Sequence, residues 1–80
     1  MEITILAFGI AKEILGGNRV NITLNEPANI KALKQLLEHN YPPLKELASY
    51  MIAVNNNYAS DTQTILSTDE IALIPPVSGG

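Results

Sequence analysis

The sequence contains no cysteine, so neither disulfide bonds nor cysteine-based metal sites can stabilise this chain of 80 residues. A chain of that length has room for one small core, which must therefore hold by packing alone. Hydrophobic residues make up 46% of the sequence, enough for a packed domain and too many for a disordered chain. We expect a single folded domain.

The first third of the sequence predicts two strands with a short helix between them. Residues 2–8 and 19–24 alternate apolar and polar side chains, the pattern of strands with one buried face. Residues 10–15 carry isoleucines four positions apart and precede the glycines at 16–17, which is typical of a short helical turn closed by glycine.

A longer amphipathic helix is predicted over residues 30–40, with Asn29 as its N-cap. The prolines at 42–43 must end it, because proline lacks the N–H group that a continuing helix needs. Lys34 and Glu38 are one turn apart on its polar side, and we expect them to form a weak surface ion pair.

The second half of the sequence predicts a hairpin and a last strand. Residues 51–54 read as a strand, the asparagines at 55–57 as a turn, and residues 58–59 as the start of a return strand. The apolar run at 70–74 predicts a central strand buried on both faces. Strands on both sides of one main helix indicate an α+β domain with that helix packed on one face of the sheet. The predicted core is Ile3, Ile5, Val20, Ile22, Ile30, Leu33, Leu37, Ile52, Val54, Leu66, Ile71 and Leu73.

Charge and composition argue against several classes of function. The formal net charge is −3 and the five basic residues are scattered, which argues against a nucleic-acid partner. A single histidine, His39, provides neither a metal-ligand cluster nor a convincing catalytic triad. No apolar run approaches the roughly 20 residues that cross a bilayer, so a soluble, cytoplasmic protein without a membrane partner is expected. We therefore favour a carrier, a subunit or a binding module over an enzyme.

Residues 75–80, Pro75-Pro76-Val77-Ser78-Gly79-Gly80, have a composition that a folded core does not need. The prolines favour an extended chain, whereas the two glycines fit a channel too narrow for a Cβ atom. Six extended residues span about 19 Å, enough to enter a partner's active site. We therefore divide the chain into a domain at 1–74 and a flexible tail at 75–80. The alternative is that Gly79-Gly80 is merely a frayed end.

This ending resembles that of the small subunits of molybdopterin synthase, a family of ubiquitin-like sulfur carriers. The resemblance extends upstream through Asp69-Glu70-Ile71, Ala53-Val54-Asn55 and the stretch from Phe8 to Gly16, and so covers essentially the whole chain. It implies a β-grasp fold with a mixed sheet.

The resemblance also implies a mechanism and partners. A ubiquitin-activating-type enzyme would consume ATP to adenylate Gly80, and sulfur would replace the adenylate to give a thiocarboxylate. The large synthase subunit would accept the tail, from Pro75 to Gly79, and use the sulfur to build the dithiolene of molybdopterin. This chain would then be a non-catalytic sulfur-donor subunit of a sulfurtransferase, with only a transient glycyl adenylate and no permanently bound cofactor or metal.

Two points stay open at this stage. The resemblance places Phe8 on the surface that the partners use, whereas a lone aromatic residue on a strand is more often buried, and the residues alone favour burial. A Gly-Gly ending also suits a covalent protein modifier or the sulfur carrier of thiamine biosynthesis, although Pro75-Pro76 argues against the latter. A structural interaction domain with an inert tail is the remaining alternative.

Overall fold

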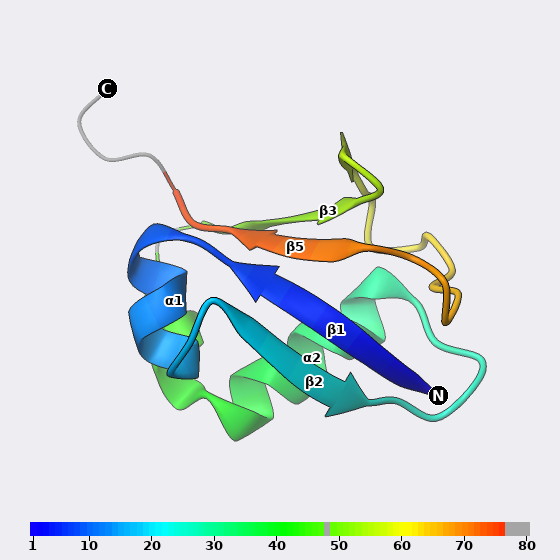
Figure 1. Ribbon diagram of the computed structural model, residues 1–80, viewed down its shortest axis with the longest axis horizontal. Helices are drawn as coiled ribbons and strands as arrows, with labels where there is room; N and C mark the ends of the chain where they lie inside the picture. Colours follow the sequence, from blue (N-terminus) through cyan, green and yellow to red (C-terminus); the bar gives the residue numbers. More distant parts are fainter. Residues whose placement is uncertain (48, 77–80) are drawn as a thin grey trace.

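The computed structural model describes residues 1–47 and 49–76 as a five-stranded sheet with helices (Figure 1). The elements are β1 (Glu2–Ala7), α1 (Gly9–Leu15), β2 (Arg19–Thr23), α2 (Ile30–Asn40), the 3₁₀ helix η1 (Pro42–Glu46), β3 (Met51–Val54), β4 (Asn57–Tyr58) and β5 (Ile71–Ile74).

The sheet has the strand order β2-β1-β5-β3-β4. Its central pair, β1 and β5, is parallel, with Ala7 opposite Leu73, and the other pairs are antiparallel. Helix α2 crosses one face of this sheet, whereas α1 lies at the end where β1 and β5 finish (Figure 1). The prediction of an α+β domain with one main helix on one face of a mixed sheet is confirmed, and the arrangement is that of a β-grasp fold.

Local signals place the helix ends where the sequence predicts them. The Asn29 side chain accepts a hydrogen bond from the backbone N–H of Ala32 at 2.9 Å, which satisfies one of the free donors of the first turn of α2. Gly16 closes α1 with φ of 83°, a conformation that costs a residue with a Cβ atom about 1 kcal/mol or more. Its N–H donates to the carbonyl of Lys12 at 3.0 Å.

The core lies between α2 and the sheet face that it covers. Ile30, Leu33 and Leu37 of the helix are fully buried. Eleven of the twelve predicted core residues are buried or partly buried, and the exception is Leu66, which is 59% exposed. The chain is extended there, and the N–H of Ile65 donates to the carbonyl of Ala28 at 2.9 Å. Successive side chains of an extended segment point to opposite sides, so Ile65 enters the core and Leu66 faces solvent.

The prediction of a central strand at residues 70–74 is confirmed for 71–74, but burial on both faces is wrong. Ile71 and Leu73 are fully buried against the helix side, whereas Ala72 and Ile74 are only partly buried. Because α2 forms a single helical layer on one side, the opposite side of β5 has no element that covers it among the described residues (Figure 1).

The turn between β3 and β4 anchors the start of β5. Asn55 and Asn56 have φ of 52° and 71°, the left-handed region that asparagine tolerates. The Asn55 side chain accepts from the N–H of Glu70 at 2.9 Å and donates to the Asp69 carboxylate at 3.0 Å. Its own N–H donates to the Glu70 carbonyl at 2.8 Å. Two of these bonds hold the backbone of Glu70 against the turn, and the third holds the side chain of Asp69.

The polar side of α2 pairs with other segments rather than with itself. Lys34 forms an ion pair with Asp61 at 2.8 Å, so the expected Lys34–Glu38 pair is wrong. Glu38 instead accepts a hydrogen bond from the hydroxyl of Tyr50, and the Lys34 ammonium lies 5.8 Å from the centre of that ring. Burial, followed by the hydrogen bond to Glu38 and the charges of Glu38 and Asp61, raises the pKa of Tyr50.

This raised pKa predicts a loss of stability in alkali that Tyr50→Phe should remove. The unfolded chain ionises Tyr50 near pH 10 and the folded chain only at higher pH, so its contribution is complete below about pH 10 and declines above it. In urea unfolding, Tyr50→Phe should cost about 1 kcal/mol at pH 7, and this difference from the wild type should shrink as the pH rises above 10. Tyr41→Phe is the control. A constant difference up to pH 11 would contradict the linkage.

Candidate partner-docking surface

The face of the sheet opposite α2 is the candidate functional surface. The alternation along the strands sends Leu6 of β1, Ala72 and Ile74 of β5 and Ala53 of β3 to this side. Farther along the same face the side chains are polar, and Thr4 donates a hydrogen bond to Asn21 there at 2.9 Å. The apolar half of the face is therefore the half that adjoins the end of β5.

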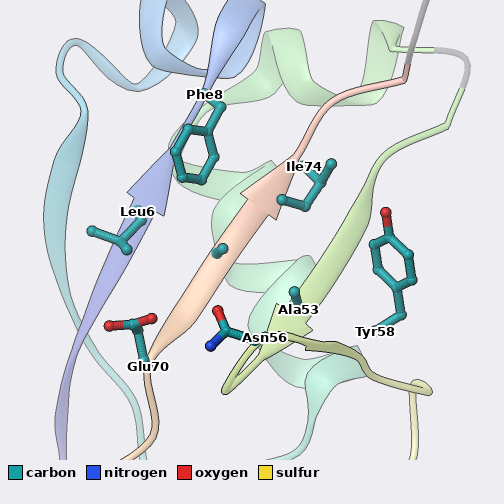
Figure 2. A pocket seen from close by; sticks show the side chains of 8 residues that line it. Leu6, Phe8, Ala53, Asn56, Tyr58, Glu70 and Ile74 are labelled. Atoms are coloured by element: carbon teal, nitrogen blue, oxygen red, sulfur yellow. The ribbon is translucent and has the colours of Figure 1, made fainter.

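A hollow of about 350 Å³ occupies this apolar half (Figure 2). Phe8 and Tyr58 stand on opposite sides of it and are 51% and 65% exposed. Large apolar side chains that expose half their surface, gathered around one concavity, are typical of a protein-binding site. The lining residues are Leu6, Phe8, Ala53, Asn56, Tyr58, Glu70, Ala72 and Ile74.

The hollow adjoins the base of the predicted tail. Ile74 lines the hollow and is also the last residue of β5, so Pro75 follows it directly. Gly9, with φ of 55°, turns the chain from β1 into α1 beside this point, and a Cβ atom on it would lie 3.4 Å from Cγ of Pro75. The parallel register that places Ala7 opposite Leu73 accounts for this contact. A partner that receives the tail must therefore pass close to the hollow.

The predicted site residues fall into two groups. Phe8 lies exposed at the rim of the hollow, so the expectation of burial is wrong, and its place on the surface that partners use stays a prediction. It is exposed because β1 ends at Ala7 and Phe8 is the N-cap of α1. Pro75 and Pro76 lie within the residues that the structure describes and are partly buried. Val77, Ser78, Gly79 and Gly80 lie outside the described residues, so the division into a domain and a tail stays a prediction.

Sequence reasoning did not identify the remaining residues of the hollow. Leu6 is out of phase with Ile3 and Ile5, and Ala72 and Ile74 are out of phase with their buried neighbours on β5. In a domain with one main helix, that helix covers only one face of the sheet. Apolar residues out of phase with the core were therefore the sequence signal for an apolar surface on the other face.

Metal and membrane sites receive no support from the described part of the chain. Within residues 1–47 and 49–76, no three metal-ligating side chains are grouped closely enough to hold an ion. No helix in these ranges has the length and apolar character needed to cross a membrane.

The sequence matches known proteins over its whole length. The ThiS family matches residues 5–80. The molybdopterin synthase sulfur carrier subunit of Dictyostelium discoideum is 38% identical, with 99% of this chain and 96% of that protein covered. The subunit of the same description from Arabidopsis thaliana is 36% identical and covers 100% of this chain and 84% of its own length.

Solved structures share the fold. A putative molybdopterin converting factor subunit 1 from Pyrococcus furiosus superposes with a TM-score of 0.88 at 23% identity, over 96% of this chain and 99% of that one. SAMP1 from Haloferax volcanii gives 0.84 at 22% identity, with both chains fully covered. A complex of subunits 1 and 2 of the molybdopterin-converting factor from Helicobacter pylori includes a chain with a TM-score of 0.69 and 26% identity, again fully covered.

Proposed function

This chain belongs to the ThiS family and, within it, to the molybdopterin synthase sulfur carrier subunits, and on that premise we propose that it carries sulfur on Gly80 for the synthesis of molybdopterin. The observation that supports this most directly is the full-length similarity to curated subunits of that name. The Gly79-Gly80 ending supplies the chemical group, a carboxylate on a tether without side chains.

The proposed chemistry has three steps, all at the carboxylate of Gly80. An adenylating enzyme joins the carboxylate to the α-phosphate of ATP and releases pyrophosphate. Hydrosulfide then attacks the activated carbonyl carbon and displaces AMP, and loss of a proton leaves a thiocarboxylate. In the large subunit the thiocarboxylate sulfur attacks a carbon of a pterin precursor and displaces an oxygen leaving group from it, which gives a thioester. Water then cleaves the acyl–sulfur bond, which leaves the sulfur on the pterin and returns Gly80 to a carboxylate. This chain contributes the carrier group, and its partners contribute the catalytic residues.

The open face of the sheet provides the docking surface for this role. Phe8, Tyr58 and Ile74 surround the hollow and Ile74 directly precedes Pro75, so a partner can cover the hollow and receive the tail in one contact. The large subunit is the partner we propose, in keeping with the complex of two converting-factor subunits from Helicobacter pylori.

A native mass spectrum of the chain purified from its own cells tests the proposal. We expect one carboxylate oxygen of Gly80 to be replaced by sulfur in part of the population, and a larger subunit to be bound non-covalently. An isopeptide bond between Gly80 and lysines of assorted proteins would favour a protein modifier instead. An unmodified terminus without a partner would favour an interaction domain, and both results would contradict the proposal.

A further inference from the structure

The hollow exists because two small residues lie side by side among large ones. Ala53 of β3 and Ala72 of β5 are directly opposite each other in the sheet, and their methyl groups form the floor. Phe8, Tyr58 and Ile74 rise around that floor (Figure 2). Larger residues at the two alanine positions would fill the space, so the floor sets the size of any group that enters.

The volume matches one bulky side chain of a partner. A cavity of about 150 Å³ encloses a benzene molecule, and this hollow of about 350 Å³ is larger but open to solvent on one side. It is at the low end of the range of roughly 300–1,000 Å³ for small-molecule sites, which normally enclose most of their ligand. An aromatic or large aliphatic side chain that projects from a protein surface is of a size to enter such an open hollow.

One part of the rim is acidic. Glu70 lines the hollow, and within residues 1–47 and 49–76 no basic group lies within ion-pairing distance of its carboxylate. Asn55 holds the backbone of Glu70 in place through the hydrogen bonds described above, and the amide of Asn56 lies on the same side of the hollow (Figure 2). An exposed carboxylate on an anchored backbone, beside an apolar hollow, is complementary to a cation next to an apolar side chain.

We propose that the hollow receives a single bulky apolar side chain of the large synthase subunit, and that a lysine or arginine beside it pairs with Glu70. This inference rests on the proposed function. The hollow shares Ile74 with the base of the tail, so a protein that accepts the tail also covers the hollow. We choose the large subunit over the adenylating enzyme because the similar chain from Helicobacter pylori is in complex with the second converting-factor subunit. A second copy of this chain would bring together two molecules of net charge −3, which opposes association.

Filling the floor tests the apolar part of the proposal. Ala72→Leu projects into the hollow rather than the core, and Thr4→Leu is the matched control, because Thr4 is also partly buried on the open face but does not line the hollow. In calorimetric titration with the large subunit, Ala72→Leu should weaken binding by about tenfold or more and Thr4→Leu by less than about threefold. Equal affinities for the two variants, with both folded by circular dichroism, would overturn it.

A charge reversal tests the acidic part. Glu70→Lys should weaken binding by about fivefold or more at low salt and flatten its dependence on salt. Glu2→Lys, which makes the same change on an exposed residue of β1 that does not line the hollow, should have a smaller effect. Equal effects of the two reversals would show that only the net charge matters, and would overturn the assignment of Glu70.

The two proposals fail in different ways. If the wild-type chain does not bind the large subunit at all, the proposed function fails. The hollow is then tested alone, by NMR titration of the isolated chain with N-acetyl-leucinamide and N-acetyl-tryptophanamide. We expect shifts at Ala53 and Ala72 in the wild type and none in Ala72→Leu at the same positions. No shifts in the wild type, or a dimer that Ala72→Leu dissociates, would overturn the hollow as a site for a partner's side chain.

Discussion

Deletion of Gly80 is expected to abolish sulfur transfer while leaving the fold intact. The deletion moves the terminal carboxylate back along the tail by about 3.3 to 3.6 Å, the span of one extended residue. A misplacement of about 1 Å at a reacting centre can cost about 100-fold in rate, so both adenylation and transfer should fall by at least that factor. The measurement is the yield of thiocarboxylate and of molybdopterin in a reconstituted reaction with the activating enzyme and the large subunit.

Two controls separate the chemistry of the tail from binding and folding. Ser67→Ala changes an exposed residue outside both the tail and the hollow, so it should retain the activity of the wild type. The Gly80 deletion should also bind the large subunit through the open face and should unfold at the wild-type urea concentration, because the hollow and the core lie within residues 1–76. Molybdopterin synthesis at the wild-type rate by the Gly80 deletion would refute the proposed role of this residue.

Leu33→Ala should have the largest effect on stability. Leu33 is fully buried on α2, and truncation of such a leucine costs about 2 to 5 kcal/mol, depending on how far the cavity collapses. A domain of this size has a free energy of unfolding of about 4 to 12 kcal/mol, so the variant should be partly unfolded or close to it at 37 °C. Urea unfolding followed by circular dichroism measures the loss.

Leu36→Ala is the matched control on the same helix. Leu36 is only partly buried and contacts the edge of the core, so its truncation should cost about 1 kcal/mol. Equal losses in the free energy of unfolding for the two variants would contradict the prediction, because the cost of truncation would then not follow the burial of the side chain. In conditions where both remain folded, neither should change affinity for the large subunit, because α2 lies behind the sheet and the hollow in front of it (Figure 2).

Short-range patterns were sufficient for most of the fold. The cap at Asn29, the stop at Gly16 and the turn at Asn55 each depend on a few neighbouring residues, and each has the predicted geometry. Long-range contacts were harder to predict. Lys34 pairs with Asp61, 27 positions away, because the loop before β5 passes beside α2, whereas the helical pattern alone suggested Glu38.

The candidate site also has a part that the sequence indicated and a part that only long-range contacts revealed. The resemblance directed attention to Phe8 and to the tail ending at Gly80, but it did not identify Ala53, Tyr58 and Glu70 as neighbours of Phe8. These residues come from different strands, and only their pairing in the sheet brings them around one hollow. Before that pairing is known, the small size of Ala53, the exposure of Tyr58 and the charge of Glu70 do not indicate a shared site.

The sequence by itself determined that this chain forms one α+β domain and where its helices begin and end, and its terminal motif predicts that Gly80 carries sulfur. These properties depend on periodicity, on capping and turn residues, and on a terminal motif, all of which act over short stretches of chain. Only the tertiary structure decided that no element within residues 1–47 and 49–76 covers one face of the sheet and that Ala53 and Ala72 form the floor of a hollow there. The physical reason is that burial depends on which layers pack on the sheet, and α2 covers one face.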